Sequence, residues 1–307
     1  MKINNKKFLL ALVCLLAVSC SESDSIPSPA DPEKPEPGID VVQLPIVVHI
    51  VHFGDETGAG PNLSTDRILR QIEILNEDFR KKEGTRGYND HVDGADAKIE
   101  FVLAKLDPES NPTDGINRID ASAMQVENLG YNQNHYAQYA YWDPNRYINI
   151  WVTPLPEDTE CIALGMASGP LTNLPGTALL SIPGDGDADG ILINWIHFGE
   201  SEIDCHVKYG RTLTHEMGHF LGLLHTWGGK DCEHNDYCDD TPAVADAVYG
   251  RTPYAGCDGE TIMIGNYMNY SDDDVMNIFT NDQVERMYYV LNNHTGRNSL
   301  MTSPALK

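Results

Sequence analysis

The chain has 307 residues, of which 41% are hydrophobic, and it carries a formal net charge of −25. This length and apolar content allow one large domain, or two subdomains that share a cleft, with a substantial buried core. The strong negative charge argues against nucleic acid and anionic membrane surfaces as partners, because both require clustered Lys and Arg side chains.

The N-terminus is predicted to be a targeting segment rather than part of the fold. Lysines precede an apolar run over residues 8–18, which is too short to span a bilayer but typical of a signal-peptide core. The run ends in AVSC at 17–20, which resembles a bacterial lipobox. We therefore expect residues 1–19 to be a lipoprotein-type signal peptide and Cys20 to carry the lipid. The alternative is an ordinary cleaved signal with a chance cysteine.

Residues 20–40 are rich in Ser, Pro, Asp and Glu, with almost nothing to bury. This composition predicts a disordered tether between the lipid and the domain, or alternatively a short pro-segment. The expected location is the outer membrane or surface of a bacterial cell, with the membrane contacted only through the N-terminal lipid. The remaining residues, 41–307, are expected to form the folded domain.

Apolar patterns beyond residue 40 predict strands and helices. Strands are predicted at 44–51, 99–106, 147–152, 178–182 and 191–196, and helices at 64–79, 211–221 and 280–291. Ser64 is a candidate helix cap, and Thr280 with Gln283 forms a candidate capping box. Most strands precede the histidine-rich helix at 211–221, whereas loops and one helix follow it. This layout predicts an α+β fold.

A histidine motif carries the chemistry. Residues 215–225 read HEMGHFLGLLH, which fits H-E-x-x-H-x-x-G-x-x-H. His215 and His219 are four residues apart, so on a helix their imidazoles lie on one face and can bind one ion. Gly222 can adopt a positive φ and end the helix, so that the chain turns and brings His225 to the same ion. Three histidines leave a fourth zinc position free for water, as in catalytic sites.

Glu216 is expected to take a proton from that water and pass it to the leaving amine. The reaction predicted from the motif is therefore hydrolysis by a zinc enzyme. Two alternatives remain at this point: a catalytically inactive zinc-binding surface module, and a zinc hydrolase that acts on a non-peptide bond.

The motif also indicates a family. H-E-x-x-H-x-x-G-x-x-H resembles the metzincin peptidases, and HEMGHFLGLLHTW at 215–227 is most similar to the pappalysin (ulilysin-like) family within them. The segments LPIVVHIV at 44–51, ILNEDFR at 74–80, YINIWV at 147–152 and NYMNY at 266–270 resemble the same family. The resemblance covers most of the chain beyond the tether.

The resemblance implies a metzincin-type catalytic domain over 41–307. A twisted mixed sheet with two long helices would form an upper subdomain at about 41–222, and a loop-rich lower subdomain with a C-terminal helix would follow at about 223–307. Such a zinc endopeptidase binds a protein or peptide substrate as an extended strand along an edge strand, for which residues 191–196 are the candidate. The resemblance further implies that Met268 forms the apolar Met-turn beneath the metal, and that Tyr270 stabilises the tetrahedral intermediate.

Three further expectations rest on the resemblance. Relatives bind calcium just before a similar D-T-P, so Asp236, Asp239 and Thr241 are candidate calcium ligands; the alternative is a solvated acidic loop. Cys232 and Cys257 match a family disulfide. Asp274 matches the acid that selects Arg or Lys at P1′ in some relatives; the alternative is surface charge or calcium ligation.

Other patterns are weaker. Asp185, Asp187 and Asp189 imitate the start of an EF-hand loop, but its twelfth position would be Ile196 rather than Glu. Val275 stands where a second family disulfide ends, so that bridge is absent. Partners among three further cysteines stay unassigned: Cys161, Cys205 and Cys238.

Overall fold

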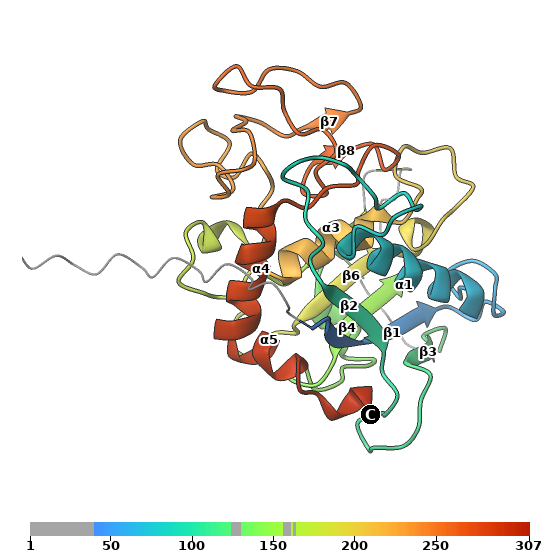
Figure 1. Ribbon diagram of the computed structural model, residues 1–307. Helices are drawn as coiled ribbons and strands as arrows, with labels where there is room; N and C mark the ends of the chain where they lie inside the picture. The colour runs from blue at the N-terminus through green and yellow to red at the C-terminus, as the bar shows by residue number, and fades with distance from the viewer. Residues whose placement is uncertain (1–39, 124–129, 156–160, 162–163) are drawn as a thin grey trace, which may run out of the picture. The chain divides into compact units, whose positions relative to one another are not determined.

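The structure is a computed structural model that describes residues 40–123, 130–155, 161 and 164–307 (Figure 1). The strands are β1 Val42–His52, β2 Ile99–Leu103, β3 Ile116–Asp120, β4 Ile148–Thr153, β5 Gly165–Ala167, β6 Gly190–Asn194, β7 Tyr249–Gly250 and β8 Tyr270–Ser271. The helices are α1 Thr65–Phe79, α2 Gln133–Ala137, α3 Arg211–Phe220, α4 Asn281–Asn293 and α5 Thr295–Leu300, with 3-10 turns η1 Thr177–Leu179, η2 Trp195–His197 and η3 Pro304–Leu306. The predicted signal peptide, Cys20 and almost all of the predicted tether lie outside the described residues.

Six strands form one mixed sheet in the order β2-β1-β4-β6-β5, with β3 also paired to β1. β1 pairs with β2 along its first half and with β3 along its second half, because its 11 residues are long enough for both. All of these pairs are parallel except the one between β5 and β6. β5 therefore lies at one edge of the sheet and runs against its neighbours.

Most predicted elements are confirmed. The predicted strands at 44–51, 99–106 and 147–152 correspond to β1, β2 and β4, and the predicted helices at 64–79, 211–221 and 280–291 correspond to α1, α3 and α4. The Ser64 hydroxyl accepts a hydrogen bond from the Arg67 amide, and Thr280 and Gln283 form the full capping box. Local patterns decide these elements because their apolar residues repeat with the helix or strand period.

Two predictions about the sheet are wrong. Residues 178–182 form no strand: the Leu179 and Leu180 amides donate to Gly176 and Thr177 carbonyls, so the chain makes the 3-10 turn η1. The predicted edge strand at 191–196 is the interior strand β6, which lies between β4 and β5 and is buried along its whole length. A continuous apolar run is typical of such interior strands, and the edge strand is the short β5.

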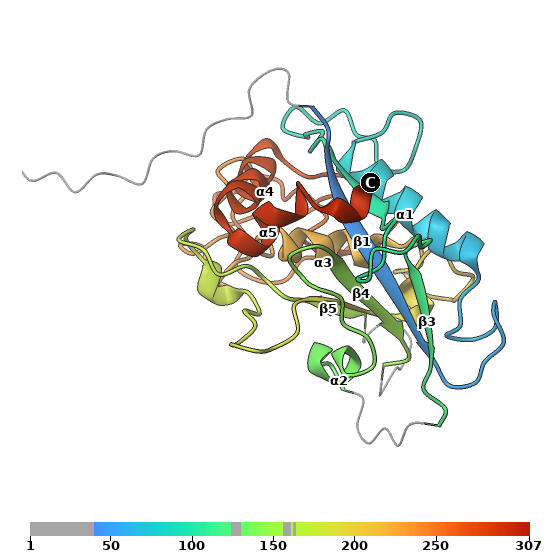
Figure 2. The same cartoon turned by 90° about the horizontal axis from the view of Figure 1, so that it is seen from below.

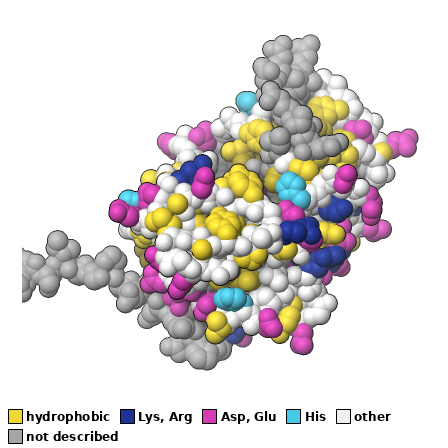
Figure 3. Space-filling view, turned by 90° about the horizontal axis from the view of Figure 1, so that it is seen from above, with side chains coloured by type: hydrophobic (Ala, Val, Ile, Leu, Met, Phe, Trp, Pro, Cys, Tyr) yellow, Lys and Arg dark blue, Asp and Glu magenta, His cyan; other side chains and the backbone are white. Residues whose placement is uncertain are grey.

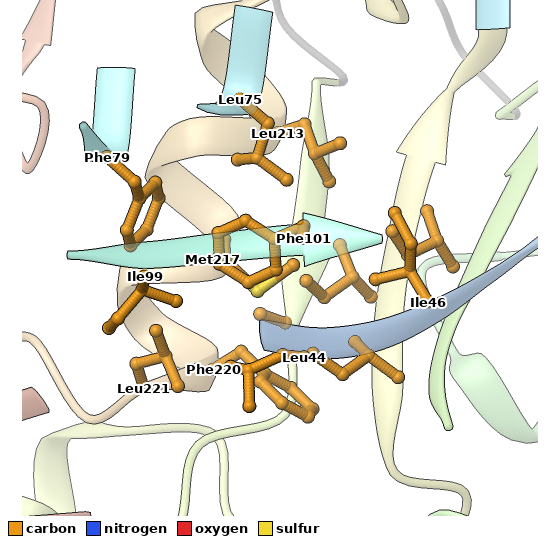
Figure 4. Packing of buried hydrophobic residues seen from close by; sticks show 14 of the residues in the cluster. Leu44, Ile46, Leu75, Phe79, Ile99, Phe101, Leu213, Met217, Phe220 and Leu221 are labelled. Carbon is orange, nitrogen blue, oxygen red and sulfur yellow. The ribbon is translucent and has the colours of Figure 1, made fainter. Parts of the chain in front are cut away.

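Helices α1 and α3 pack on one face of the sheet (Figure 4). Phe79 of α1 contacts Phe101 of β2 with ring centroids 4.9 Å apart, and Met217 of α3 lies in the same cluster. Burying each large apolar side chain stabilises the fold by about 1.5–3 kcal/mol. This core holds α3 against the sheet and so determines where its polar face lies.

The opposite face of the sheet carries a smaller cluster around Trp151, which is fully buried and donates its indole N–H to the Ala140 carbonyl. α2 lies on this side (Figure 2) and contributes Tyr136 to that cluster. Loops follow α3, and α4 then returns to the main core through Met287 and Leu291. Within the described residues, no helix is both long and apolar enough to cross a membrane.

Candidate metal centre and active-site cleft

The histidines of the motif converge at the end of α3. The Nε2 atoms of His215, His219 and His225 lie 3.1 Å from one another, in all three pairs. Neutral imidazoles present only lone pairs or single N–H groups at these atoms, so the arrangement suits a shared cation better than mutual hydrogen bonds. The spacing also fits three ligands held at about 2.0 Å from a zinc ion.

Backbone carbonyls orient two of these rings. The Nδ1 atom of His215 is 2.7 Å from the Tyr267 carbonyl oxygen, and that of His219 is 2.8 Å from the Leu223 carbonyl oxygen. An Nδ1–H donated to a carbonyl leaves Nε2 with its lone pair free to bind a metal. Burial lowers the pKa of His215 to about 3 and that of His219 to about 4, which keeps both rings neutral.

Gly222 brings the third histidine into place. α3 ends at Phe220, and Gly222 has a φ of 92°, a conformation that favours glycine, as the motif predicts. A Cβ at this position would lie 2.6 Å from Cγ2 of Val290 in α4, so the contact with α4 also requires glycine. After the turn, His225 stacks on Trp227 with ring centroids 4.3 Å apart, which fixes the imidazole plane.

Met268 lies beneath the centre. Its side chain is fully buried, and a Cβ added to Gly218 of α3 would lie 2.5 Å from its sulfur. The thioether therefore packs directly against the helix between the first two histidines. The resemblance implies this placement, and the close contact explains why this chain has glycine at 218, a variable position of the motif.

Glu216 and Tyr270 face the same space as the histidines. Glu216 is buried, and burial raises its pKa to about 8, whereas a cation bound nearby would favour its charged form. The Tyr270 ring lies 4.8 Å from that of His225 and 5.6 Å from that of His215. Burial raises the pKa of Tyr270 to about 12, so its hydroxyl stays a hydrogen-bond donor at neutral pH.

A cavity of about 390 Å³ opens on one side of the histidines, lined by Glu216, Tyr270 and Asp273, among other residues. Asp273 is buried, and its Oδ2 accepts from the backbone amides of Tyr209 and Arg211. Asp274 does not line this cavity. Its side chain is partly exposed and pairs with Arg251 at 3.0 Å. The acid that faces the cavity is thus one residue earlier than the sequence comparison suggests.

The acidic loop after the third histidine brings only part of the expected calcium set together. Asp236 is buried, and its Oδ1 accepts from the Thr241 hydroxyl at 2.6 Å, while its Oδ2 is buried without a hydrogen-bond partner. Asp239 is exposed, and its amide donates to Asp282.

In the EF-hand-like run, Asp189 is bound by Arg297 at 2.6 and 2.9 Å, and Asp187 accepts from Gly184 and Asn134. These carboxylates face cations and amides of the protein, so they do not converge on one ion.

The described cysteines form two disulfides. Cys232 joins Cys257, the pair that the resemblance implies, and Cys161 joins Cys205, a pair that the sequence leaves open. Cys238 is buried and unpaired. The Cys161–Cys205 bridge lies close to the cleft, because Cys161 and His206 line the cavity that holds Asp273.

Comparison with known proteins identifies the family. A profile described as pregnancy-associated plasma protein-A, a peptidase family, matches residues 130–292. An extracellular metalloprotease of Colletotrichum graminicola is 44% identical over 255 residues, which cover 80% of this chain and 76% of that protein. The chain belongs to the pappalysin family. A second relative, an extracellular metalloprotease of Arthroderma benhamiae, is 36% identical over 270 residues, or 84% of this chain and 75% of that protein.

Solved pappalysin structures agree with this assignment. Mature mirolysin of Tannerella forsythia in complex with a cleaved peptide is 30% identical, with a TM-score of 0.69 over 86% of this chain and 96% of that chain. Mirolysin in complex with compound 9 has a TM-score of 0.72, also at 30% identity, over 87% of this chain and 99% of that chain. The α+β metzincin fold is therefore confirmed. This pappalysin is an extracellular zinc metalloendopeptidase.

Sequence reasoning missed three residues of the cleft. Gly165 of β5 lines the cavity beside Glu216, but a strand of three residues with one glycine has no detectable alternation. The sequence favours Asp274 over Asp273, because sequence alone does not show which acid of a run points inward. Arg211 was also missed: its guanidinium is buried and lies 3.1 Å from Asp78.

Proposed function

We propose that His215, His219 and His225 hold the zinc ion of this metalloendopeptidase. The observation that carries the proposal is the triangle of Nε2 atoms, 3.1 Å on each side, at the wall of a cleft. Zinc bound there would polarise the scissile carbonyl and lower the pKa of a bound water to about 7.

Two further residues of the chain act on the substrate in this proposal. Glu216 accepts the proton of the attacking water and delivers it to the leaving amine, which a buried carboxylate at the cleft wall can do over a short path. Tyr270 donates a hydrogen bond from its protonated hydroxyl to the oxygen of the scissile carbonyl as negative charge develops there.

The substrate binds as an extended strand along β5. This strand is the last of the described sheet, and its residues line the cleft beside Glu216. A peptide that adds to this edge forms main-chain hydrogen bonds while its alternate side chains enter pockets. That mode requires no side chain of a particular kind from β5, which is consistent with the glycine and alanine among its three residues.

We further propose a preference for Arg or Lys at P1′, with Asp273 as the acid that selects it. Asp273 lines the cavity, whereas Asp274 is paired with Arg251 outside it. The matched variants Asp273→Asn and Asp274→Asn test the assignment with peptides that differ only at P1′. Asp273→Asn should lower the ratio of kcat/KM for the P1′ Arg peptide to kcat/KM for the P1′ Leu peptide by about tenfold or more. Asp274→Asn should leave that ratio unchanged. The reverse result would return the role to Asp274.

Calcium binding at the acidic loop is a separate proposal. The buried, unpartnered Oδ2 of Asp236 supports it, because a buried carboxylate oxygen without a donor is costly unless a cation satisfies it. Thr241 and Asp239 are the other proposed ligands. Calcium should raise the melting temperature of the wild type but not of Asp236→Asn, and the exposed Asp231→Asn is the control. An equal response of all three proteins would refute the site.

The anchoring proposal concerns residues outside the described structure. We propose that residues 1–19 are removed as a signal peptide, that Cys20 is lipidated, and that residues 20–40 are the tether to a peptidase domain at 41–307. The AVSC sequence at 17–20 supports it. Metabolic labelling with a radioactive fatty acid should mark the wild-type protein but not Cys20→Ser, and labelling of both would refute the anchor.

A peptide library, incubated with and without a zinc chelator, tests the whole proposal. Cleavage should stop with the chelator and return with added zinc. Glu216→Ala should bind zinc stoichiometrically but lose cleavage, and His219→Ala should lose both. Glu216→Ala with wild-type activity would overturn the role of the carboxylate.

A further inference from the structure

A second cavity, of about 250 Å³, opens on the other side of the histidines. It shares Gly165, His215, Glu216 and Tyr270 with the first cavity, so the two flank one centre. Of the residues that line it and not the first cavity, five are apolar, namely Met166, Ala167, Leu179, Leu180 and Leu224, and the others are Ser181, His219, His225 and Gly228. Apart from Glu216, no Asp, Glu, Lys or Arg of the described chain lines it. The first cavity differs, because Asp273 and Arg211 also line it.

The direction of β5 assigns the two cavities to opposite ends of a bound peptide. Leu164 and Gly165 line the first cavity, whereas Gly165, Met166 and Ala167 line the second, so β5 runs from the first towards the second. A peptide added antiparallel to β5 runs the other way. In a peptide of that orientation, the residues before the scissile bond would lie at the second cavity, and the residues after the bond would lie at the first.

The outer wall of the second cavity is the segment around η1, which lies beside α4 in Figure 1. The same segment also covers the chain just past β5, so the unpaired edge of β5 stops there. The amide of Gly169 donates to the Ser181 carbonyl at 2.8 Å, so the backbone just past β5 is already paired. Leu180 lies so close to Gly169 that a Cβ there would be 2.5 Å from the Leu180 Cβ. In this direction, pairing of a peptide with β5 therefore ends at Ala167.

The wall is held in place by contacts with the metal-binding region. Gly176 has a φ of 75°, and a Cβ at this position would lie 2.4 Å from Leu224 and 2.6 Å from Tyr237. Arg286 of α4 is buried and donates both to the Pro175 carbonyl at 2.8 Å and to the Gly222 carbonyl at 2.7 Å. One guanidinium therefore joins the wall to the turn that follows α3.

Leu179 is the part of the wall that a ligand can reach. Its side chain lines the cavity yet is 52% exposed in the absence of a peptide. Covering it and the neighbouring Leu180 and Leu224 with an apolar side chain would remove apolar surface from water at about 25 cal/mol per Å². On the face shown in Figure 3, hydrophobic side chains are exposed at several places, with acidic and basic side chains between and around them.

We propose that this cavity is a subsite for an apolar side chain on the N-terminal side of the scissile bond, with Leu179 as a specificity-determining residue. We propose also that the groove on this side ends where Ser181 pairs with Gly169. The occupant is the peptide substrate, because the cavity is continuous with the centre that cleaves it. The inference rests on the proposed function and adds the selectivity of its non-primed side.

The test uses the full-length enzyme with fluorogenic peptides that carry Arg at P1′ and vary one residue at a time at P1, P2 and P3. Wild-type enzyme should favour Leu or Phe over Ser and Asp at one of these positions by about tenfold in kcat/KM. Lengthening the peptide beyond P3 should give no further gain, because the β5 edge ends there.

Leu179→Asp should remove the apolar preference and favour Lys or Arg at the same position, whereas Leu179→Lys should favour Asp or Glu. The P1′ profile should not change in either variant, and a merely structural defect would not reverse with the sign of the new charge. Leu171→Asp is the matched control, since Leu171 lies in the same segment, is 68% exposed and does not line the cavity.

The outcomes separate the two proposals. Wild-type enzyme that cleaves no peptide, with or without added zinc, refutes the proposed function itself. Wild-type enzyme that cleaves with a flat profile at P1 to P3, or Leu179 variants with the wild-type profile, refutes the subsite alone. A shift of similar size in Leu171→Asp also refutes it, because the effect would then reflect general charge near the cleft.

Discussion

Arg211 at the start of α3 provides the sharpest test of how the fold supports the cleft. Its guanidinium and the Asp78 carboxylate are both fully buried and lie 3.1 Å apart, and its backbone amide donates to Asp273. Arg211→Met keeps the length and the apolar stem of the side chain but removes the charge. It leaves Asp78 buried without a cation, although the hydrogen bond from the Thr214 hydroxyl remains.

We expect Arg211→Met to lose about 3–5 kcal/mol of unfolding free energy, the usual cost of a buried charge left without its partner. Arg70→Met is the control on α1. It breaks ion pairs with Glu77 and Glu200, but the Arg70 side chain is 34% exposed, so we expect a loss of about 1 kcal/mol or less. Urea unfolding measures both, with zinc removed so that metal binding does not contribute to the difference.

The loss in Arg211→Met should also depend on pH. Burial raises the pKa of Asp78, and the Arg211 charge opposes that rise, so the variant should raise this pKa further. A carboxyl with a raised pKa contributes stability that is present at low pH and lost as pH rises through its folded-state pKa. The deficit should therefore be larger at about pH 8 than at about pH 5. A deficit below about 1 kcal/mol, or one that grows on acidification, would refute the reasoning.

Three further predictions concern residues around the proposed zinc site. Gly222→Ala should weaken zinc binding and lower the melting temperature, because an alanine there would be strained and would clash with α4; zinc affinity equal to wild type would contradict this. Met268→Ala should lower the unfolding free energy, measured in urea, by about 2–5 kcal/mol, because it opens a cavity under Gly218. A loss below about 1 kcal/mol would show that the surrounding side chains close this cavity. Tyr270→Phe should lower kcat by about tenfold or more with little change in KM, since the hydroxyl acts as charge develops; a change confined to KM would assign it to binding instead.

Much of this protein follows from local sequence. The helix over 211–221 and the turn at Gly222 are encoded by residue spacing, since the histidines must share a helical face and the third must come from beyond a helix end. β1 follows from a run of β-branched residues, and α4 from its capping box. These features depend on neighbours within a few positions, which a single sequence displays directly.

Only the tertiary structure determines which residues line the walls of the cleft. The edge strand is β5 rather than residues 191–196, because strand order depends on pairings between distant segments and a strand of three residues carries no periodic signal. Asp273 rather than Asp274 faces the cavity, because a turn held by backbone contacts to the loop before α3 directs one acid inward. The sequence by itself therefore determined the convergence of His215, His219 and His225, because all three come from one short segment. The packing of remote segments decided the pockets on both sides of it, and with them the expected choice of substrate.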